Sequence, residues 1–287
     1  MIETTLKTID ISKRAFIFGG AYGNLQATRA ILAKATELGF SKSEIIFTGD
    51  TIAYCANPIE TVEIIKNSVD YIIMGNCEEA IADGSNDCGC GFEEGSKCST
   101  LSNQWYNFCL SQIDKQTALW MGTLPKSLII DLAGKKFLVT HATPTSINQF
   151  IFPSSLEKNQ DTQDVDGYIV GHSGIPFIGK TNGKPWVNSG ACGMPANDGT
   201  RRVWFATIDC SNEKTIIETH ALDYDFKTAH SAMQAALLNN GYQECLSSGI
   251  WPSHDVLPAH EKNQTGIRLQ PQKKAFQRTP LINNILA

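Results

Sequence analysis

Apolar residues in the first part of the chain form short runs separated by longer stretches of helical spacing. Residues 15–18 are such a run, and across residues 25–38 the apolar positions recur at helical spacing. Residues 45–47 and 71–74 predict two further strands, and Pro58 predicts the start of a helix between them. Because strands alternate with helices, this part of the chain predicts a mostly parallel sheet with right-handed crossovers.

The second half of the chain is richer in strands. Residues 77–121 break the alternation with a loop rich in glycine, cysteine and acidic residues, followed by a helical pattern, which we interpret as an insertion over one end of the sheet. Further strands are predicted at residues 127–131, 137–140, 168–170, 186–188, 203–208 and 215–219. Since little helix lies between them, the pattern favours a second sheet packed on the first, with a helix over residues 226–240.

One catalytic domain is expected over residues 1–241, with the insertion inside it. Residues 242–287 are rich in proline and poor in apolar residues, so they predict an extended tail whose last ten or so residues are disordered. A few apolar side chains of this tail are expected to dock onto the domain: Ile250, Trp251, Val256 and Leu257.

Composition narrows the class of protein. The chain has 287 residues, 42% hydrophobic and 18% charged, which is typical of a soluble globular protein. A net charge of -5 gives no footprint for nucleic-acid polymers or anionic membranes, and no stretch approaches the ~18 apolar residues that span a bilayer. No secretory signal is visible, so we expect a cytoplasmic protein whose nine cysteines remain thiols unless a metal binds them.

Four polar side chains follow predicted strands directly: Asp50, Asn76, His141 and His172. Open α/β sheets bind ligands at the carboxyl ends of their strands, so these side chains are expected to converge on one edge. A carboxylate, an amide oxygen and two imidazoles suit Zn²⁺, Mn²⁺ or Fe²⁺, with positions left open for water or phosphate. The sequence therefore predicts a divalent metal site.

With these motifs the chain resembles the calcineurin-like metallophosphoesterases, in particular the compact bacterial phosphodiesterases and the diadenosine tetraphosphatase group. The resemblance covers roughly residues 14–210 and rests on six short segments in the family's order: Gly20-Ala21-Tyr22-Gly23-Asn24, Gly49-Asp50, Gly75-Asn76-Cys77-Glu78, His141-Ala142-Thr143-Pro144, Gly171-His172-Ser173-Gly174 and Asn188-Ser189-Gly190-Ala191. It implies an α/β fold in which two mixed β-sheets pack as a sandwich flanked by helices.

The resemblance also implies two sets of metal ligands that share Asp50. The complete set, as we call it, has every ligand in place: Asp50, Asn76, His141 and His172. The incomplete set would use positions 20, 22 and 174 besides Asp50, and these hold Gly20, Tyr22 and Gly174. Glycine has no side chain to donate, and a phenol with a pKa near ~10 is a poor ligand for Zn²⁺ or Mn²⁺. One bound ion is therefore expected, and a second is left open.

Cysteines raise a further possibility near this site. The family's leaving-group acid, a histidine, is replaced by Cys77, whose thiol has an ordinary pKa near ~8.5. We hypothesise that a cysteine-rich loop caps or fills the space left by Gly20 and Gly174 and holds Zn²⁺ or iron there. The alternative is a set of buried thiols without a metal role. The cysteines concerned are Cys77, Cys88, Cys90 and Cys98.

The function expected from the resemblance is hydrolysis of a small phosphorylated substrate, nucleotides included, by a metal-activated water. Asn24, Tyr22 and Asn76 are expected to contact the phosphate, with Asn76 and Cys77 as catalytic residues. Two alternatives stay open: a non-hydrolytic protein that binds metal or nucleotide on the same scaffold, and a redox or iron site that involves the cysteine loop. The structural alternatives are core histidines, a helix-capping Asp50 and a Tyr22 that fills space at the rim.

Overall fold

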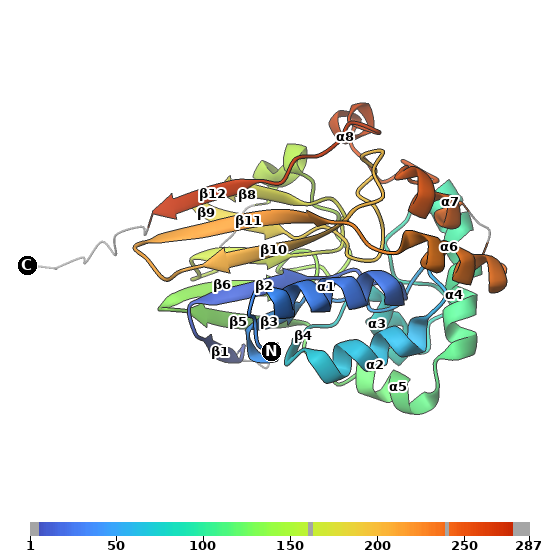
Figure 1. The fold of residues 1–287 in the computed structure, drawn as a ribbon, viewed down its shortest axis with the longest axis horizontal. Coiled ribbons are helices and arrows are strands. Elements are labelled where there is room, and N and C mark those ends of the chain that lie inside the picture. Colours follow the sequence, from blue (N-terminus) through green and yellow to red (C-terminus); the bar gives the residue numbers. More distant parts are fainter. Residues whose placement is uncertain (1–5, 160–162, 239–240, 278–287) are drawn as a thin grey trace, which may run out of the picture.

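Two six-stranded β-sheets lie face to face in the computed structural model, which describes residues 6–159, 163–238 and 241–277 (Figure 1). The first sheet has the order β1 (Thr8–Ile11), β5 (Ser127–Leu132), β6 (Lys135–Thr140), β7 (Gly167–Val170), β9 (Lys184–Asn188) and β8 (Phe177–Thr181). The second has the order β12 (Lys273–Gln277), β11 (Lys214–Leu222), β10 (Val203–Asp209), β2 (Arg14–Phe18), β3 (Ile45–Phe47) and β4 (Tyr71–Ile72). Both sheets are mixed, which confirms the expected fold class.

The side chains of β2 point alternately to its two faces, and this alternation shows how the layers are held together. Ala15 and Ile17 point into the space between the sheets, where they join apolar residues from strands of both. Phe16 and Phe18 point the other way and pack under the helices of the outer face. A strand with both faces buried has a continuous run of apolar residues in its sequence, and β2 has such a run. β2 therefore lies at the centre of the molecule.

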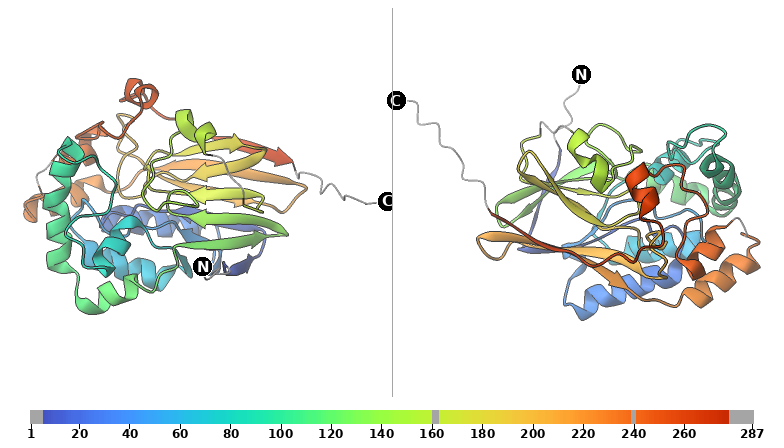
Figure 2. Two further views of the ribbon diagram at one scale, coloured as in Figure 1. Left: turned by 180° about the vertical axis from the view of Figure 1, so that it is seen from behind. Right: turned by 90° about the horizontal axis from the view of Figure 1, so that it is seen from above.

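Helices cover one outer face and one end of the sandwich, as the turned views of Figure 2 show. The outer face of the second sheet carries α1 (Leu25–Glu37) and α2 (Pro58–Ser68). Gathered toward the end are α3 (Asn76–Ala82), α4 (Lys97–Gln112), α5 (Lys115–Met121), α6 (Phe226–Ala235) and α7 (Tyr242–Ser248), and α8 (Ala259–Asn263) stands apart. Short 3-10 helices span Lys42–Glu44 and Pro153–Lys158. Among the helices described, none combines the length and apolar character that crossing a bilayer requires.

The insertion and the C-terminal part differ from expectation in detail. The inserted segment begins as α3, and its glycine-rich loop runs from 83 to 96 rather than from Cys77. The helix predicted over residues 226–240 ends at Ala235, and residues 239–240 lie outside the described part of the chain. Strands β1, β8 and β12 were not predicted.

The expectation of an extended tail after residue 241 is wrong for the parts of that segment that form regular elements. The segment forms α7, α8 and β12, and β12 extends the second sheet by pairing antiparallel with β11. Partly buried Phe276 packs against the apolar layer between the sheets, which is the physical reason that this segment joins the fold. Trp251, Val256 and Leu257 dock as expected. The predicted disorder of the last residues falls outside the described chain.

Candidate metal centre

Asp50, Asn76, His141 and His172 meet at one end of the sandwich, and each sheet contributes two of them. Asp50 and Asn76 follow β3 and β4, whereas His141 and His172 follow β6 and β7. These are parallel pairs in different sheets, so the expected single edge is in fact the junction of two sheets. Ligand atoms of Asp50, His141 and His172 lie within 4.8 Å of one another.

Nε2 of His141 is at the centre of this group. It lies 3.3 Å from Oδ2 of Asp50, 3.1 Å from Oδ1 of Asn76 and 3.3 Å from Nδ1 of His172. The other ring nitrogen, Nδ1, lies 2.6 Å from the backbone oxygen of Thr48 and must donate a proton to it. In the neutral imidazole, Nε2 then carries a lone pair directed at the other three side chains.

Asn76 is oriented by the loop that follows α3. Its Nδ2 donates to the backbone oxygen of Cys88 over 2.8 Å, so its Oδ1 faces His141. The centre therefore brings together a carboxylate oxygen, an amide oxygen and an imidazole lone pair, which are all acceptors. Buried acceptors in contact need a proton or a cation between them. The residues present thus fit a divalent ion.

The close packing of these buried groups shifts their pKa values. Burial, together with any charge on His141, lowers the pKa of His172 to about 3, which keeps that imidazole neutral. Burial alone would lower the pKa of His141, but the charge of Asp50 raises it above 6.5. Burial would raise the pKa of Asp50, but the charge of His141 and its hydrogen bond to the carboxylate hold that pKa below 3.8. A proton on His141 and a metal ion are therefore alternative partners for the Asp50 carboxylate.

Glu78 holds the Asp50 turn and was given no role from the sequence. Its fully buried carboxylate accepts hydrogen bonds from the backbone N–H groups of Asp50 at 2.8 Å, Thr51 at 2.6 Å and Gly75 at 2.8 Å. Oδ1 of Asp50 accepts in turn from the backbone N–H of Cys77 at 3.1 Å. The signal for this role was the acidic fourth position of the segment that begins at Gly75.

Tight turns present these side chains. Asp50, His172 and Tyr22 adopt left-handed φ values of 61°, 57° and 53°. Gly49 precedes Asp50 with a φ of 93°, and a β-carbon there would lie 2.6 Å from the Gly75 nitrogen and 2.8 Å from Nδ1 of His141. Only glycine permits that approach of the two turns.

Aromatic side chains stand where the incomplete set lacks ligands. A β-carbon on Gly20 would lie 2.8 Å from Cζ of Tyr22 and 3.2 Å from Cβ of Ala191. At Gly174 the nearest atom to such a carbon is Cζ2 of Trp251, at 3.4 Å. Burial and the charge of Asp50 raise the pKa of Tyr22 well above 10.0, so its side chain remains a phenol. The atoms nearest both positions thus belong to Tyr22, Trp251 and Ala191, not to cysteines.

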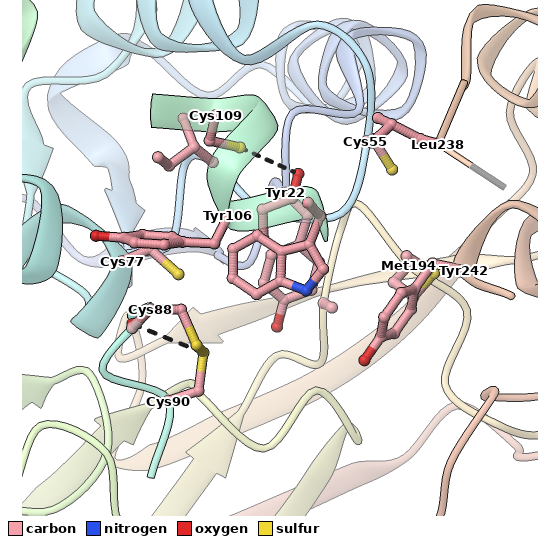
Figure 3. Packing of buried hydrophobic residues seen from close by; sticks show 14 of the residues in the cluster. Tyr22, Cys55, Cys77, Cys88, Cys90, Tyr106, Cys109, Met194, Leu238 and Tyr242 are labelled. Atoms are coloured by element: carbon pink, nitrogen blue, oxygen red, sulfur yellow. Dashed lines mark hydrogen bonds between the residues drawn. A yellow bond between two sulfur atoms is a disulfide. The ribbon is translucent and has the colours of Figure 1, made fainter. Parts of the chain in front are cut away.

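The cysteine loop packs against Asn76. The structure joins Cys88 to Cys90 by a disulfide, and Cys77 points toward this pair (Figure 3). The expectation that every cysteine is a thiol is wrong here, because Gly89, with a φ of 63°, turns the chain so that the two Cα atoms lie 5.3 Å apart. Burial and Asp50 raise the pKa of Cys77 well above 9.0, which keeps it a thiol.

Among the described residues, the group with metal-ligand geometry is Asp50, His141 and His172, and it contains no cysteine. A cavity adjoins that group, and Cys77, Cys90 and Cys98 line it. Metal binding by the loop stays a prediction.

Asn24 has a different role from the one expected. Its Oδ1 accepts from the backbone N–H of Ala27 at 3.1 Å and so caps α1. Its Nδ2 donates to the backbone oxygen of Gly193 and to the hydroxyl of Tyr224. The polar atoms of Asn24 are thus used inside the fold and it does not line the cavity, so its contact with phosphate stays a prediction that this arrangement does not support.

Comparison with known proteins agrees with this fold. A family model for the calcineurin-like phosphoesterase superfamily domain matches residues 23–213. The uncharacterized protein MJ0912 of Methanocaldococcus jannaschii is 26% identical over 231 residues, which is 75% of this chain and 89% of that protein.

Two solved structures share the fold over 83% of this chain and 99% of their own. They are a metallophosphoesterase from Sphaerobacter thermophilus, with a TM-score of 0.66 and 19% identity, and the hypothetical protein PH1004 from Pyrococcus horikoshii, with a TM-score of 0.67 and 16% identity. The two-sheet sandwich is thus the fold of a metallophosphoesterase. The chain belongs to the calcineurin-like phosphoesterase superfamily.

Proposed function

We propose that this protein hydrolyses a phosphoester with one divalent ion, Mn²⁺, Fe²⁺ or Zn²⁺, held by the complete set of Asp50, Asn76, His141 and His172. The observation that carries the proposal is the convergence of three side chains on Nε2 of His141, whose orientation is fixed by Thr48. A bound ion of this kind lowers the pKa of a water molecule and polarises a phosphoryl oxygen.

The protein's own residues prepare the site for that chemistry. Glu78 fixes the backbone of Asp50, and the carbonyl of Cys88 fixes the amide of Asn76, so the ligands are oriented before an ion arrives. Tyr22 lies beside the centre with 7% of its surface exposed and limits access of bulk water. Four ligand residues leave positions open to substrate on an ion that takes six ligands.

Cys77 lines the cavity together with Asp50, which supports a role for its thiol at the leaving group. Its raised pKa makes it a weak acid, so we expect proton donation from it to matter for poor leaving groups alone. Cys77→Ser should leave hydrolysis of p-nitrophenyl esters within about threefold of the wild type and slow alkyl esters by roughly tenfold.

The test of the proposed function is turnover of an aryl phosphodiester and an aryl phosphomonoester with added Mn²⁺, Fe²⁺ or Zn²⁺. Asp50→Asn and His141→Ala should each lower kcat/KM by at least about 100-fold, because each removes a ligand. His260→Ala is the matched control, since His260 is exposed and far from these motifs in the sequence. A wild type as inert as the Asp50 and His141 variants with every metal would exclude hydrolysis.

A non-hydrolytic binding protein is the second candidate. It is favoured by Gly20 and Gly174, which leave the second ion without ligands, and by the aromatic rings next to them. A rise in melting temperature with a nucleotide that is never turned over would support this candidate.

A further inference from the structure

The cavity beside Asp50 and His172 has walls unlike those of the metal centre. Aromatic side chains from separate parts of the chain supply much of the lining: Tyr22, Tyr54, Phe92, Phe150, Tyr242 and Trp251. Among the described residues that line it there is neither a lysine nor an arginine. A phosphate group therefore finds no cationic side chain here and depends on the ion, which leaves the aromatic wall for another part of the substrate.

The wall is uncharged at neutral pH. Burial raises the pKa of Tyr22 and Tyr54 well above 10.0, and it raises that of Tyr242 as well, so all three remain phenols. Asp50, the acidic residue of the lining, sits at the metal centre. An uncharged group enters such a space at lower cost in free energy than an anion does.

The rings support one another and so are in place before a ligand binds. Tyr54 lies 4.1 Å from Tyr242 and 4.8 Å from Tyr22, measured between ring centroids. Phe150 lies 4.3 Å from the imidazole of His172 at an interplanar angle of 35°. Rigid aromatic walls favour planar, aromatic ligands through stacked and edge-to-face contacts.

Size limits what the cavity accepts. Its volume is about 60 Å³. At roughly 10–15 Å³ for each water, this space holds about four to six water molecules, which together take up about as much room as one benzene ring. The aromatic ring is expected to displace that water, and contact with the wall replaces the lost interactions.

We propose that this cavity binds one uncharged six-membered aromatic ring of the substrate, so that the substrates are phosphodiesters that carry an aryl or single-ring base group. That the bound ring belongs to a substrate rests on the proposed function. The ring site itself does not depend on hydrolysis. A diester carries one negative charge, which a single ion can neutralise without help from lysine or arginine. Trp251 and Val256, both from the C-terminal segment, form part of the wall and are the positions to change.

The probe is 4-fluorophenol, whose ¹⁹F signal broadens when it binds a large protein. Wild type should broaden the signal without added metal, and phenol should displace the probe at least about tenfold more effectively than cyclohexanol. Added Mn²⁺, which is paramagnetic, should broaden the bound signal further, because the ring lies beside the metal centre. That extra broadening should disappear in His141→Ala.

Two variants change the cavity in opposite ways. Trp251→Leu removes part of the aromatic wall and Val256→Phe fills the space, so each should weaken binding of 4-fluorophenol by at least about tenfold. Trp120→Leu is the matched control, since Trp120 lies over Lys66 and outside this cavity, and it should bind the probe as the wild type does. One ion per chain in all three would show that the metal centre is intact.

The outcomes separate the two proposals. No broadening by the wild type, or equal broadening with Trp251→Leu and Val256→Phe, overturns the ring site even if phosphoesters are hydrolysed. If the protein binds the probe specifically but hydrolyses no phosphoester, the ring site is supported and hydrolysis is excluded as the function.

To separate an aryl group from a base, uracil is added as a competitor. Displacement of 4-fluorophenol by uracil at a concentration similar to that of phenol favours a nucleoside ester as the natural substrate. Displacement by phenol alone favours an aryl ester.

Discussion

The ring of Tyr22 covers Gly20: a β-carbon on Gly20 would stand 2.9 Å from the phenol oxygen and 2.8 Å from the ring carbon that bears it. The size of each residue constrains the size of the other. A smaller side chain at position 22 would leave a cavity, and a larger one at position 20 would collide with the ring. The ring of Tyr22 and Cβ of Ala191 occupy the space next to Gly20. The side chains at positions 20 and 22 are therefore structurally coupled.

This contact predicts a coupled effect on stability. Gly20→Ala should lower the free energy of unfolding by about 3 kcal/mol, because the left-handed backbone and the ring both resist a methyl group. In a Tyr22→Ala background the same change should cost about 1 kcal/mol, the strain alone. Urea unfolding of the four proteins measures the difference.

Gly84→Ala is the control for backbone strain. Gly84 has a φ of 66°, close to that of Gly20, and a β-carbon there would meet nothing within 4 Å. It should cost about 1 kcal/mol in either background. Equal costs for Gly20→Ala with and without the Tyr22 ring would contradict the contact.

Glu78→Gln should damage the site from outside the ligand set. An amide has one acceptor oxygen where the carboxylate has two, so backbone N–H groups of the Asp50 turn lose their partner at a cost of about 3 kcal/mol. Affinity for Mn²⁺, measured by calorimetry, should fall roughly 10- to 100-fold.

The neighbouring residue Glu79 provides the matched control for this change. It lies on the same helix and pairs at the surface with Lys126, so Glu79→Gln should change stability by less than about 1 kcal/mol and leave metal affinity unchanged. Equal metal affinity in the two variants would show that Glu78 does not position Asp50.

Stability should depend on pH through Glu44, which accepts hydrogen bonds from the backbone N–H and hydroxyl of Ser41, each at 3.0 Å. Burial alone would raise its pKa, but the hydrogen bonds from Ser41 and Ser12 and the nearby Arg14 lower it below 4.5. Because the folded-state pKa is lowered, the stabilisation is complete above pH 4.5 and is lost as pH falls through the lowered value.

Glu44→Gln should therefore reduce the free energy of unfolding by about 1 kcal/mol at pH 7 and by progressively less as the pH drops below 4.5. Glu37→Gln, at an exposed ion pair with Lys34, should stay within about 0.5 kcal/mol of the wild type throughout. Urea titrations at several pH values give both curves. A difference for Glu44→Gln that persists unchanged in acid would count against the assigned hydrogen bonds.

Thiol and metal counts test the cysteine loop. Of the nine cysteines, seven are thiols in the structure, so denatured protein should react with a thiol reagent at seven sites before reduction and nine after it. Protein purified without added metal should carry one ion, unchanged in Cys88→Ser and Cys90→Ser. Loss of the ion in both variants, or the colour of bound iron, would instead assign metal to the loop.

Much of the fold follows from the sequence because local signals there agree. The apolar run at residues 15–18, the glycine turn after it and the helical pattern from Leu25 each match an observed element. β8 and β12 were not predicted because both contain lysine and show little apolar periodicity. These strands are stabilised by pairing with β9 and β11, which no local pattern reveals.

The candidate site was predictable in part. The order of Asp50, Asn76, His141 and His172 placed them correctly at strand ends, and the structure brings them together. Other contacts could not be predicted because they join residues that are far apart in the sequence. Trp251 contacts the position of Gly174 from 77 positions further along the chain, and Asn24 donates a hydrogen bond to Gly193. The three hydrogen bonds of Glu78 depend likewise on the path of two turns.

The left-handed conformations of His172 and Asp50 set a limit on engineering this protein. Glycine at position 172 would relieve backbone strain of about 1 kcal/mol and would at the same time delete an imidazole from the centre. A screen that rewards heat resistance alone would therefore tend to select variants that have lost their chemistry. Stabilised forms are better sought on the surface of α4 and α5, away from the turns that carry the ligands.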